Sequence, residues 1–461
     1  MTIDNEAVAA TQTDGTAGTT RFWPGLRWMR RLRARSPHVY GVGVLTLLVA
    51  AVYSVFSRTL YYTFHEDTYD LVIFDQAIRS YAHFHLGYAP VKGLHNFGIY
   101  DFSVLGDHFS PIDALLAPLY WIVSSPLNLL IAQAVLFALA VPPIWVFTRR
   151  AFGGGWKGTT AAYFVAVAYG ISWPLASAAA FDFHEVAFTP LLTAIALERL
   201  QKGRLKTALV CLAGLLFVKE DTGLCVAGMG LGLAITRQLG IPRQRLAGIL
   251  IAAGSLVYTF LAVYVFIPAM GGKGNYYWAY DQLGPNIPSA ARRVLTDPVA
   301  AAQIIGTPPV KLSTLLALFA PFLFLSLLSP IVLAAIPLLL ERMLGDKFPD
   351  WWSTAYHYNA YLIVPVALAA VDGALRLDRW IGLAVRRLKK GSGPGADLLG
   401  GRLALGATAV FAAVAVALVP AFPLSQMFTS NFWHRSKLAT IEAEAAARVP
   451  SGTVTRAGHT G

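Results

Sequence analysis

The stretch Val39–Ser57, VYGVGVLTLLVAAVYSVFS, contains nineteen residues and no charged side chain. A helix of about twenty apolar residues, rising about 1.5 Å per residue, crosses the hydrocarbon core of a bilayer. Five arginines precede the stretch, at positions 27, 30, 31, 33 and 35. Because basic residues concentrate on the cytoplasmic side of membrane spans, the sequence predicts a first transmembrane helix that leaves the cytoplasm.

The composition of the whole chain agrees with this prediction. Its 461 residues are 56% hydrophobic and 13% charged, with a mean hydropathy of +0.54, whereas soluble domains carry about 25% charged residues. We therefore expect an all-α, polytopic helical membrane protein in contact with membrane lipid. The net charge of +12 comes largely from short segments between apolar stretches. Basic residues there set orientation, so we expect no nucleic-acid partner.

Apolar length and the placement of lysine and arginine predict about eleven spans, with the N-terminus inside and the C-terminus outside. The expected spans are 39–57, 127–147, 159–176, 186–200, 207–218, 222–236, 247–268, 313–328, 331–341, 359–375 and 403–420. Residues 1–35 are expected to form a disordered cytoplasmic tail, residues 36–420 the membrane domain, and residues 421–461 a polar outer tail. This layout predicts a multi-pass protein of the plasma (inner) membrane.

Two long outer loops are expected, at residues 58–125 and 269–312. In the first, Leu71, Phe74, Ile78 and Tyr81 recur at helical spacing within Tyr69–Ala82. This pattern predicts an amphipathic helix lying in the membrane interface, and residues 111–123 are expected to form a second one.

Acidic and histidine residues gather in segments predicted to lie on the outer side. The candidate site residues are Asp70, Asp107, His108, Asp182, His184, Glu185, Lys219, Glu220, Asp221 and His357. Ionisable groups beside hydrocarbon are costly and usually functional. The sequence therefore predicts a catalytic or binding site at the outer membrane surface.

Asp70 would stand at the start of the interfacial helix, where its carboxylate is suited to general-base catalysis or to capping the helix. Lys219, at the tip of an apolar hairpin beside Glu220 and Asp221, is suited to binding a phosphate or to an internal ion pair. The residues alone leave both alternatives open for each side chain.

Two Asp/His sets are candidates for binding a divalent metal ion. Asp107 and His108 form one set, and Asp182 and His184 form the other. Carboxylate and imidazole ligands together would give a mixed oxygen and nitrogen site. The spacing matches no established metal motif, so turn formation around Asp107 stays open as the alternative.

Four motifs carry a family resemblance: YDLVIFDQ at 69–76, GDHFSP at 106–111, FDFHE at 181–185 and KED at 219–221. In this order they resemble the polytopic prokaryotic membrane family called domain of unknown function 2079, over roughly residues 39–361. That family is similar to the GT-C glycosyltransferases, which are multi-span enzymes that use a polyprenyl-phosphate-linked sugar donor.

The resemblance implies catalysis at the outer face, with Asp70 at the position of the acid in the first outer loop. This chain has an isolated aspartate there, with Glu66 and Asp67 nearby, instead of a paired Asp-Glu or Asp-Asp. Asp107 and His108 would assist catalysis, and the remaining candidate residues would contact the donor, a metal ion, or a small or lipid-linked acceptor.

A second interpretation comes from the residues themselves. Carboxylates and histidines beside hydrocarbon also suit a proton- or cation-coupled transporter or a lipid flippase. The charged groups are expected at one membrane surface and no inverted repeat is visible, which favours the enzyme. A non-catalytic scaffold is the third interpretation, and it would leave the grouped polar motifs unexplained.

Overall fold

The computed structural model describes residues 36–65, 69–274, 277–388, 400–437, 440–441 and 444. The predicted N-terminal tail and about half of the predicted C-terminal tail lie outside these residues. Residues 36–41 belong to an N-terminal unit, and the described helices from Val42 onward pack as a second unit. No strand occurs in the described part of the chain, where one isolated bridge joins Tyr88 and Ser103.

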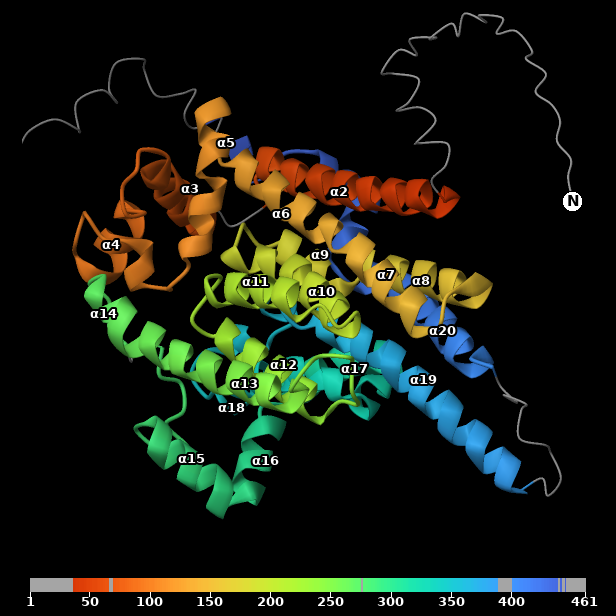
Figure 1. The fold of residues 1–461 in the computed structure, drawn as a ribbon. Helices are drawn as coiled ribbons and strands as arrows, with labels where there is room; N and C mark the ends of the chain where they lie inside the picture. The colour runs from red at the N-terminus through yellow and green to blue at the C-terminus, as the bar shows by residue number, and fades with distance from the viewer. Residues whose placement is uncertain are drawn as a thin grey trace, which may run out of the picture. The chain divides into compact units, whose positions relative to one another are not determined.

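The helices follow the chain in three groups (Figure 1). The first comprises α2 (Pro37–Thr63), α3 (Tyr69–Ala82), α4 (Pro90–Phe97) and α5 (Ala117–Ile122). The second comprises α6 (Leu127–Leu139), α7 (Val141–Ala151), α8 (Gly155–Gly170), α9 (Trp173–Ala179), α10 (Phe188–Gln201), α11 (Leu205–Leu216), α12 (Thr222–Ile235), α13 (Gln244–Leu261) and α14 (Ile267–Ala269). The third comprises α15 (Ile287–Thr296), α16 (Pro298–Gly306), α17 (Pro309–Phe319), α18 (Ile336–Leu344), α19 (Ile363–Leu388) and α20 (Arg402–Leu418).

Six helical segments among the described residues are long and apolar enough to cross a membrane. They are Pro37–Thr63, Leu127–Ala151, Gly155–Ala179, Gln244–Ala269, His357–Arg387 and Arg402–Ala421. A seventh results if Pro298–Gly306 and Val310–Phe322, bent by 84°, form one span. The polytopic helical class predicted from the sequence is thus confirmed, and the orientation of the termini stays a prediction.

The predicted number of about eleven spans is not confirmed. The segments 207–218 and 222–236 are helical, but α11 and α12 have 12 and 14 residues. Helices of this length cover about 20 Å, which is less than the hydrocarbon thickness. The segment 331–341 is divided between a 3-10 helix, η7 (Pro330–Ala334), and the nine-residue α18.

The two helices predicted in the segment 58–125 are present, and their location in the membrane interface stays a prediction. Helix α3 has the bounds that the apolar spacing predicts, Tyr69–Ala82. The second forms as a 3-10 helix, η2 (Pro111–Leu116), that continues into α5. The segment 269–312, expected as a loop, contains α15 and α16. Helix α15 begins at a capping box, in which the Ser289 N–H donates to Asn286 Oδ1 at 3.0 Å.

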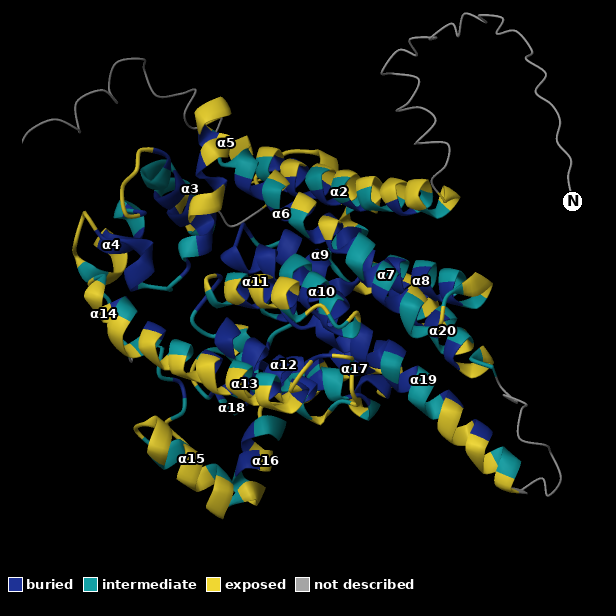
Figure 2. Cartoon of the chain, viewed as in Figure 1, coloured by how far each residue is buried: buried dark blue, intermediate teal, exposed yellow. Residues whose placement is uncertain are grey.

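Small residues allow the central helices to approach closely. Tyr361–Ala370, at the start of α19, is rich in alanine and valine, and every residue of it is buried. Gly228 in α12 faces the Leu333 carbonyl of η7 with no room for a side chain. By contrast, α13 carries a largely exposed apolar face, as Figure 2 shows, with Leu250 and Val257 among its exposed residues. Such a face suits contact with lipid.

Candidate functional site

A cavity of about 800 Å³ brings together polar residues from distant segments of the chain. Nine of the ten predicted site residues line it: Asp70, Asp107, His108, His184, Glu185, Lys219, Glu220, Asp221 and His357. The tenth, Asp182, is not among the lining residues. The sequence therefore identified a set of side chains that the fold gathers around one space.

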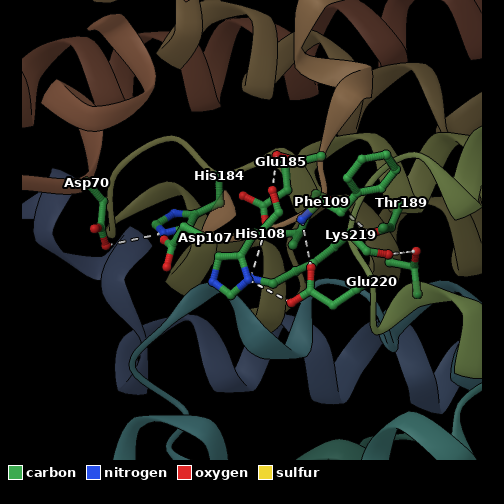
Figure 3. A network of polar contacts seen from close by, with 12 residues as sticks. Asp70, Asp107, His108, Phe109, His184, Glu185, Thr189, Lys219 and Glu220 are labelled. Atoms are coloured by element: carbon green, nitrogen blue, oxygen red, sulfur yellow. Dashed lines mark hydrogen bonds and ion pairs between the residues drawn. The ribbon is translucent and has the colours of Figure 1, made fainter. Parts of the chain in front are cut away.

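Asp70 projects from the first turn of α3 toward His184 (Figure 3). Its Oδ2 atom lies 3.3 Å from His184 Nε2, and its side chain remains one-third exposed. Burial alone would raise the pKa of Asp70, but His184, Lys92 and Lys219 together hold it below its ordinary value. Asp70 is thus an ionised carboxylate at the edge of the cavity.

Asp182 supports the helix that carries Asp70. Its Oδ2 atom accepts a hydrogen bond from the Leu71 N–H at 3.0 Å, in the first turn of α3. Asp182 has a positive φ of 36°, a conformation that aspartate tolerates better than most residues. Capping of α3, one of the two roles left open for Asp70, is therefore provided in part by Asp182. Asp182 acts on the site through the backbone of α3.

His184 and His357 lie face to face. Their ring centroids are 3.6 Å apart with an interplanar angle of 20°, and Phe181 stacks on His184 at 5.2 Å. His357 is only 3% exposed. Neither of its ring nitrogens has a hydrogen-bond partner within the described residues.

Asp107 belongs to a second group of contacts. It lies 2.8 Å from Lys92 Nζ through Oδ2, and it accepts a hydrogen bond from the Tyr277 hydroxyl at 2.6 Å. The preceding residue, Gly106, packs against the backbone of Gly272 with no room for a side chain at either position. This close approach holds Asp107 against the cavity.

His108 and Glu220 form a hydrogen-bonded ion pair, with His108 Nδ1 and Glu220 Oε1 2.7 Å apart (Figure 3). The Phe109 N–H donates to the other oxygen of Glu220 at 3.0 Å. Although burial and Lys219 oppose the charge on His108, Glu220 and Asp107 raise its pKa above the ordinary value. Burial would raise the pKa of Glu220, yet His108 and Lys219 lower it to about 2. The contact therefore favours the charged form of both partners.

Lys219 pairs with Glu185, with Nζ and Oε1 2.9 Å apart, and both side chains are almost completely buried. Burial opposes both charges, but each partner stabilises the other, so the pKa of Lys219 is raised and that of Glu185 is lowered. The ion pair that the sequence offered as one role for Lys219 thus forms. Its partner is Glu185 of the preceding motif, not the adjacent Glu220 or Asp221.

Arg342 is a cavity residue that is absent from the candidate residues predicted from the sequence. It lies on α18, is 3% exposed, and stacks over the Tyr361 ring at 4.7 Å. Its Nη1 donates to the Tyr358 carbonyl, while Nη2 has no hydrogen-bond partner in the described structure. No ion pair joins it to a carboxylate among those residues. A buried guanidinium of this kind is suited to an anionic ligand.

The four predicted metal ligands have separate partners. Asp107 contacts Lys92, His108 contacts Glu220, Asp182 contacts α3, and His184 contacts Asp70. Within the described residues, no three carboxylate, imidazole or thiol side chains form a group that would hold a metal ion. The divalent ion stays a prediction, and the arrangement does not gather these four residues into one ligand set.

One wall of the cavity is apolar. Val263 and Ile267, from the end of the α13–α14 helix, face it together with Ile287, Val294 and Leu295 of α15. The ion pairs and the histidine stack line other parts of the same cavity. A space lined by both charged and apolar side chains is suited to an amphiphilic ligand.

Comparison with known proteins gives one match. The profile of the family described as "Predicted membrane protein (DUF2079)" matches residues 60–457, which include every candidate site residue. No curated protein and no solved structure matches the chain.

Proposed function

The chain belongs to the DUF2079 family of predicted membrane proteins, and we propose that the cavity is the active site of a GT-C-type membrane glycosyltransferase. The donor is a polyprenyl-phosphate-linked sugar, and the acceptor is a small or lipid-linked molecule with a free hydroxyl group. The reaction takes place at the outer face of the membrane.

One observation carries the proposal: an ionised carboxylate at the cavity edge and a buried, incompletely bonded guanidinium line the same space. Asp70 is partly exposed and oriented by His184. Arg342 is buried and retains unused donors. A glycosyl transfer from a lipid phosphate needs these two functions, a base for the acceptor and a cation for the leaving phosphate.

In the proposed reaction, the Asp70 carboxylate accepts the proton of the acceptor hydroxyl as its oxygen attacks the anomeric carbon. The bond from that carbon to the phosphate oxygen breaks, and the electron pair leaves with the lipid phosphate. Arg342, with the nearby Lys219, stabilises the negative charge that grows on the phosphate. A single displacement inverts the anomeric configuration.

The apolar wall supports a lipid-linked donor. A polyprenyl chain that enters beside Ile267 and Val294 would keep its isoprene units against hydrocarbon side chains, while its phosphate reaches the charged side. We include a divalent cation that accompanies the phosphate as the proposed cofactor, and the test below adds Mg²⁺ or Mn²⁺ to examine it.

The test uses purified full-length protein in mild detergent. Thermal unfolding is followed while undecaprenyl phosphate, or its glucosyl or mannosyl ester, is titrated with and without Mg²⁺ or Mn²⁺. Release of undecaprenyl phosphate from each ester measures turnover. We expect saturable stabilisation by the phosphate-bearing lipids, because Arg342 engages the phosphate.

Matched variants separate binding from catalysis. Asp70→Asn is expected to retain donor-dependent stabilisation and to lose turnover by at least about 100-fold. Arg342→Lys is expected to lose the stabilisation, because an ammonium group cannot reproduce the planar fork of the guanidinium. Arg204→Lys, at an exposed turn between α10 and α11, is the control and should change neither. Absence of any lipid-dependent stabilisation in folded protein would reject the proposal.

Asp113 is the observation that favours the second candidate, a proton-coupled transporter. Its side chain is completely buried in η2, and burial together with the nearby Glu185 raises its pKa well above the ordinary value. A buried carboxyl group that holds a proton is suited to proton carriage. In proteoliposomes containing a pH-sensitive dye, such a transporter would acidify the lumen and Asp113→Asn would abolish this, whereas a glycosyltransferase would give no such signal.

A further inference from the structure

A second cavity, of about 500 Å³, lies far from the first along the same helices. On the helical segment His357–Arg387, His357 lines the first cavity and Arg379 lines the second. These two residues are 22 positions apart, which corresponds to about 30 Å of helix, the thickness of the hydrocarbon core. Leu224, near the start of α12, lines the first cavity, and Thr236, which directly follows α12, lines the second. The two cavities therefore lie toward opposite ends of the membrane-crossing helices.

The walls of the second cavity are mostly apolar. Leu197 of α10, Met229 and Leu233 of α12, Ile331 of η7 and Leu375 of α19 contribute to them. Figure 1 shows α10 and α19 beside α7, and α19 beside α20. A lining of branched and thioether side chains suits a hydrocarbon chain better than a polar metabolite.

The acidic residues of this cavity are already engaged. Asp372 Oδ2 lies 2.6 Å from Arg376 Nε. Asp378 accepts hydrogen bonds from the backbone N–H groups of Gly401 and Leu403, at 3.1 and 3.0 Å, and so caps the N-terminus of α20. Asp372 is therefore paired with a cation of its own, and both oxygens of Asp378 are occupied by backbone donors.

Two basic residues at the cavity have only carbonyl oxygens as acceptors for their charged groups. Lys157 Nζ donates to the Gly400 carbonyl at 2.6 Å, and Arg379 Nε donates to the Leu375 carbonyl at 3.1 Å. In the described part of the chain, neither pairs with a carboxylate. Both have further N–H donors, since an ammonium group has three and a guanidinium has five. An anionic group would complete both sets of contacts.

We propose that the second cavity binds an anionic phospholipid. Its phosphate lies between Lys157 and Arg379, and one acyl chain runs along Leu233 and Ile331. The unbalanced cations favour an anionic over a zwitterionic head group, and basic pockets between transmembrane helices suit such lipids. The apolar walls favour a lipid over free phosphate. This site is separate from the proposed active site and does not depend on it.

The test uses delipidated full-length protein in detergent and follows thermal unfolding during lipid titration. We expect saturable stabilisation by phosphatidylglycerol, and none by phosphatidylcholine with the same chains or by inorganic phosphate. Each surface cation contributes about a fivefold change in affinity for an anionic lipid. Lys157→Gln with Arg379→Gln should therefore weaken the phosphatidylglycerol response about 20-fold.

Lys202→Gln with Arg204→Gln is the matched control, because both residues are exposed in the turn between α10 and α11. This double variant should leave the phosphatidylglycerol response unchanged. Arg342→Gln in the first cavity should also leave it unchanged, and this result would separate the second cavity from the proposed active site. If the Lys157 substitution prevents folding, Arg379→Gln alone should weaken binding about fivefold. Equal responses to phosphatidylcholine, or to phosphate alone, would overturn the proposal. Unchanged binding by the variants would also overturn it.

Discussion

The Asp70 Oδ2 atom lies 3.3 Å from the His184 Nε2 atom, although the two residues are 114 positions apart in the sequence. The contact joins the first turn of α3 to the segment between α9 and α10. It places an oriented carboxylate at the edge of a cavity that also contains the His184–His357 stack. His184 thereby controls both the direction and the ionisation of Asp70.

Substitution of His184 by asparagine should shift the acid limb of the pH–rate profile. Burial raises the pKa of Asp70, and His184 makes the largest contribution that lowers it. Without His184, the effect of burial is less compensated and the pKa of Asp70 rises. Asp70, the proposed base, acts when it is ionised. The acid limb of the plot of kcat/KM against pH should therefore move to higher pH. At pH 8 we expect a loss of about tenfold, with a larger loss at pH 5. An unmoved limb would mean that His184 does not act through Asp70.

The buried pair Lys219–Glu185 should be a major contribution to stability. Lys219→Met leaves Glu185 charged and buried, which costs about 3–5 kcal/mol in the free energy of unfolding. The double variant Lys219→Met, Glu185→Gln should recover much of this loss, because it removes both charges. Chemical denaturation in mixed micelles measures each free energy.

The control for this pair is Lys347→Met. Lys347 lies 2.9 Å from Asp281 in a pair that is about half exposed, so the loss should be below about 1 kcal/mol. Equal losses in the two lysine variants, or no recovery in the double variant, would contradict the assignment of a buried, mutually dependent pair.

Asp182 should affect the site without contacting a substrate. Asp182→Ala removes the acceptor for the Leu71 N–H, and loss of such a cap costs about 1–2 kcal/mol. Amide hydrogen exchange should become faster in the first turn of α3, and turnover should fall because Asp70 lies in that turn. Asp182→Asn retains an acceptor oxygen and should show smaller effects on both measurements. Exchange rates unchanged by the alanine variant would argue against this role.

Local sequence patterns were sufficient to predict helices such as α3 and nine residues that line the cavity. Helix α3 follows from apolar spacing, which is a property of adjacent residues. The site residues stand out because a charge beside hydrocarbon is costly wherever it occurs. The span count was harder to predict, since α11 and α12 are apolar but too short to cross alone, and hydropathy does not show whether a short helix is buried in protein.

The pairings within the site depend on tertiary structure, which a local pattern does not contain. Lys219 has two acids next to it in the sequence, yet it pairs with Glu185, 34 positions earlier. Arg342 ends an apolar stretch, and hydropathy placed it in an outer loop. The continuation of α18 to Leu344 instead buries it against Tyr361. The sequence feature that pointed to a role for Arg342 was the charged dipeptide Glu341-Arg342 at the end of an apolar segment.

Asp221 should make the protein less stable as the pH rises from about 4 to about 6. Burial and the neighbouring Glu220 raise its pKa in the folded protein to about 6, from an ordinary value of 3.8. In this range the unfolded chain releases the Asp221 proton while the folded protein still holds it. Ionisation therefore favours unfolding until the folded form is also charged, and the effect is constant above about pH 6.

Asp221→Asn removes this contribution. Since the Asp221 side chain forms no capping hydrogen bond to α12, the amide should not cost a helix cap. The variant should match the wild type near pH 4 and exceed it by about 1–3 kcal/mol above pH 6, as measured by unfolding at a series of pH values. A difference that is the same at pH 4 and pH 7 would show that it does not arise from ionisation. A variant less stable at pH 7 would show that the Asp221 charge is balanced by its basic neighbours, Lys219 and Arg342.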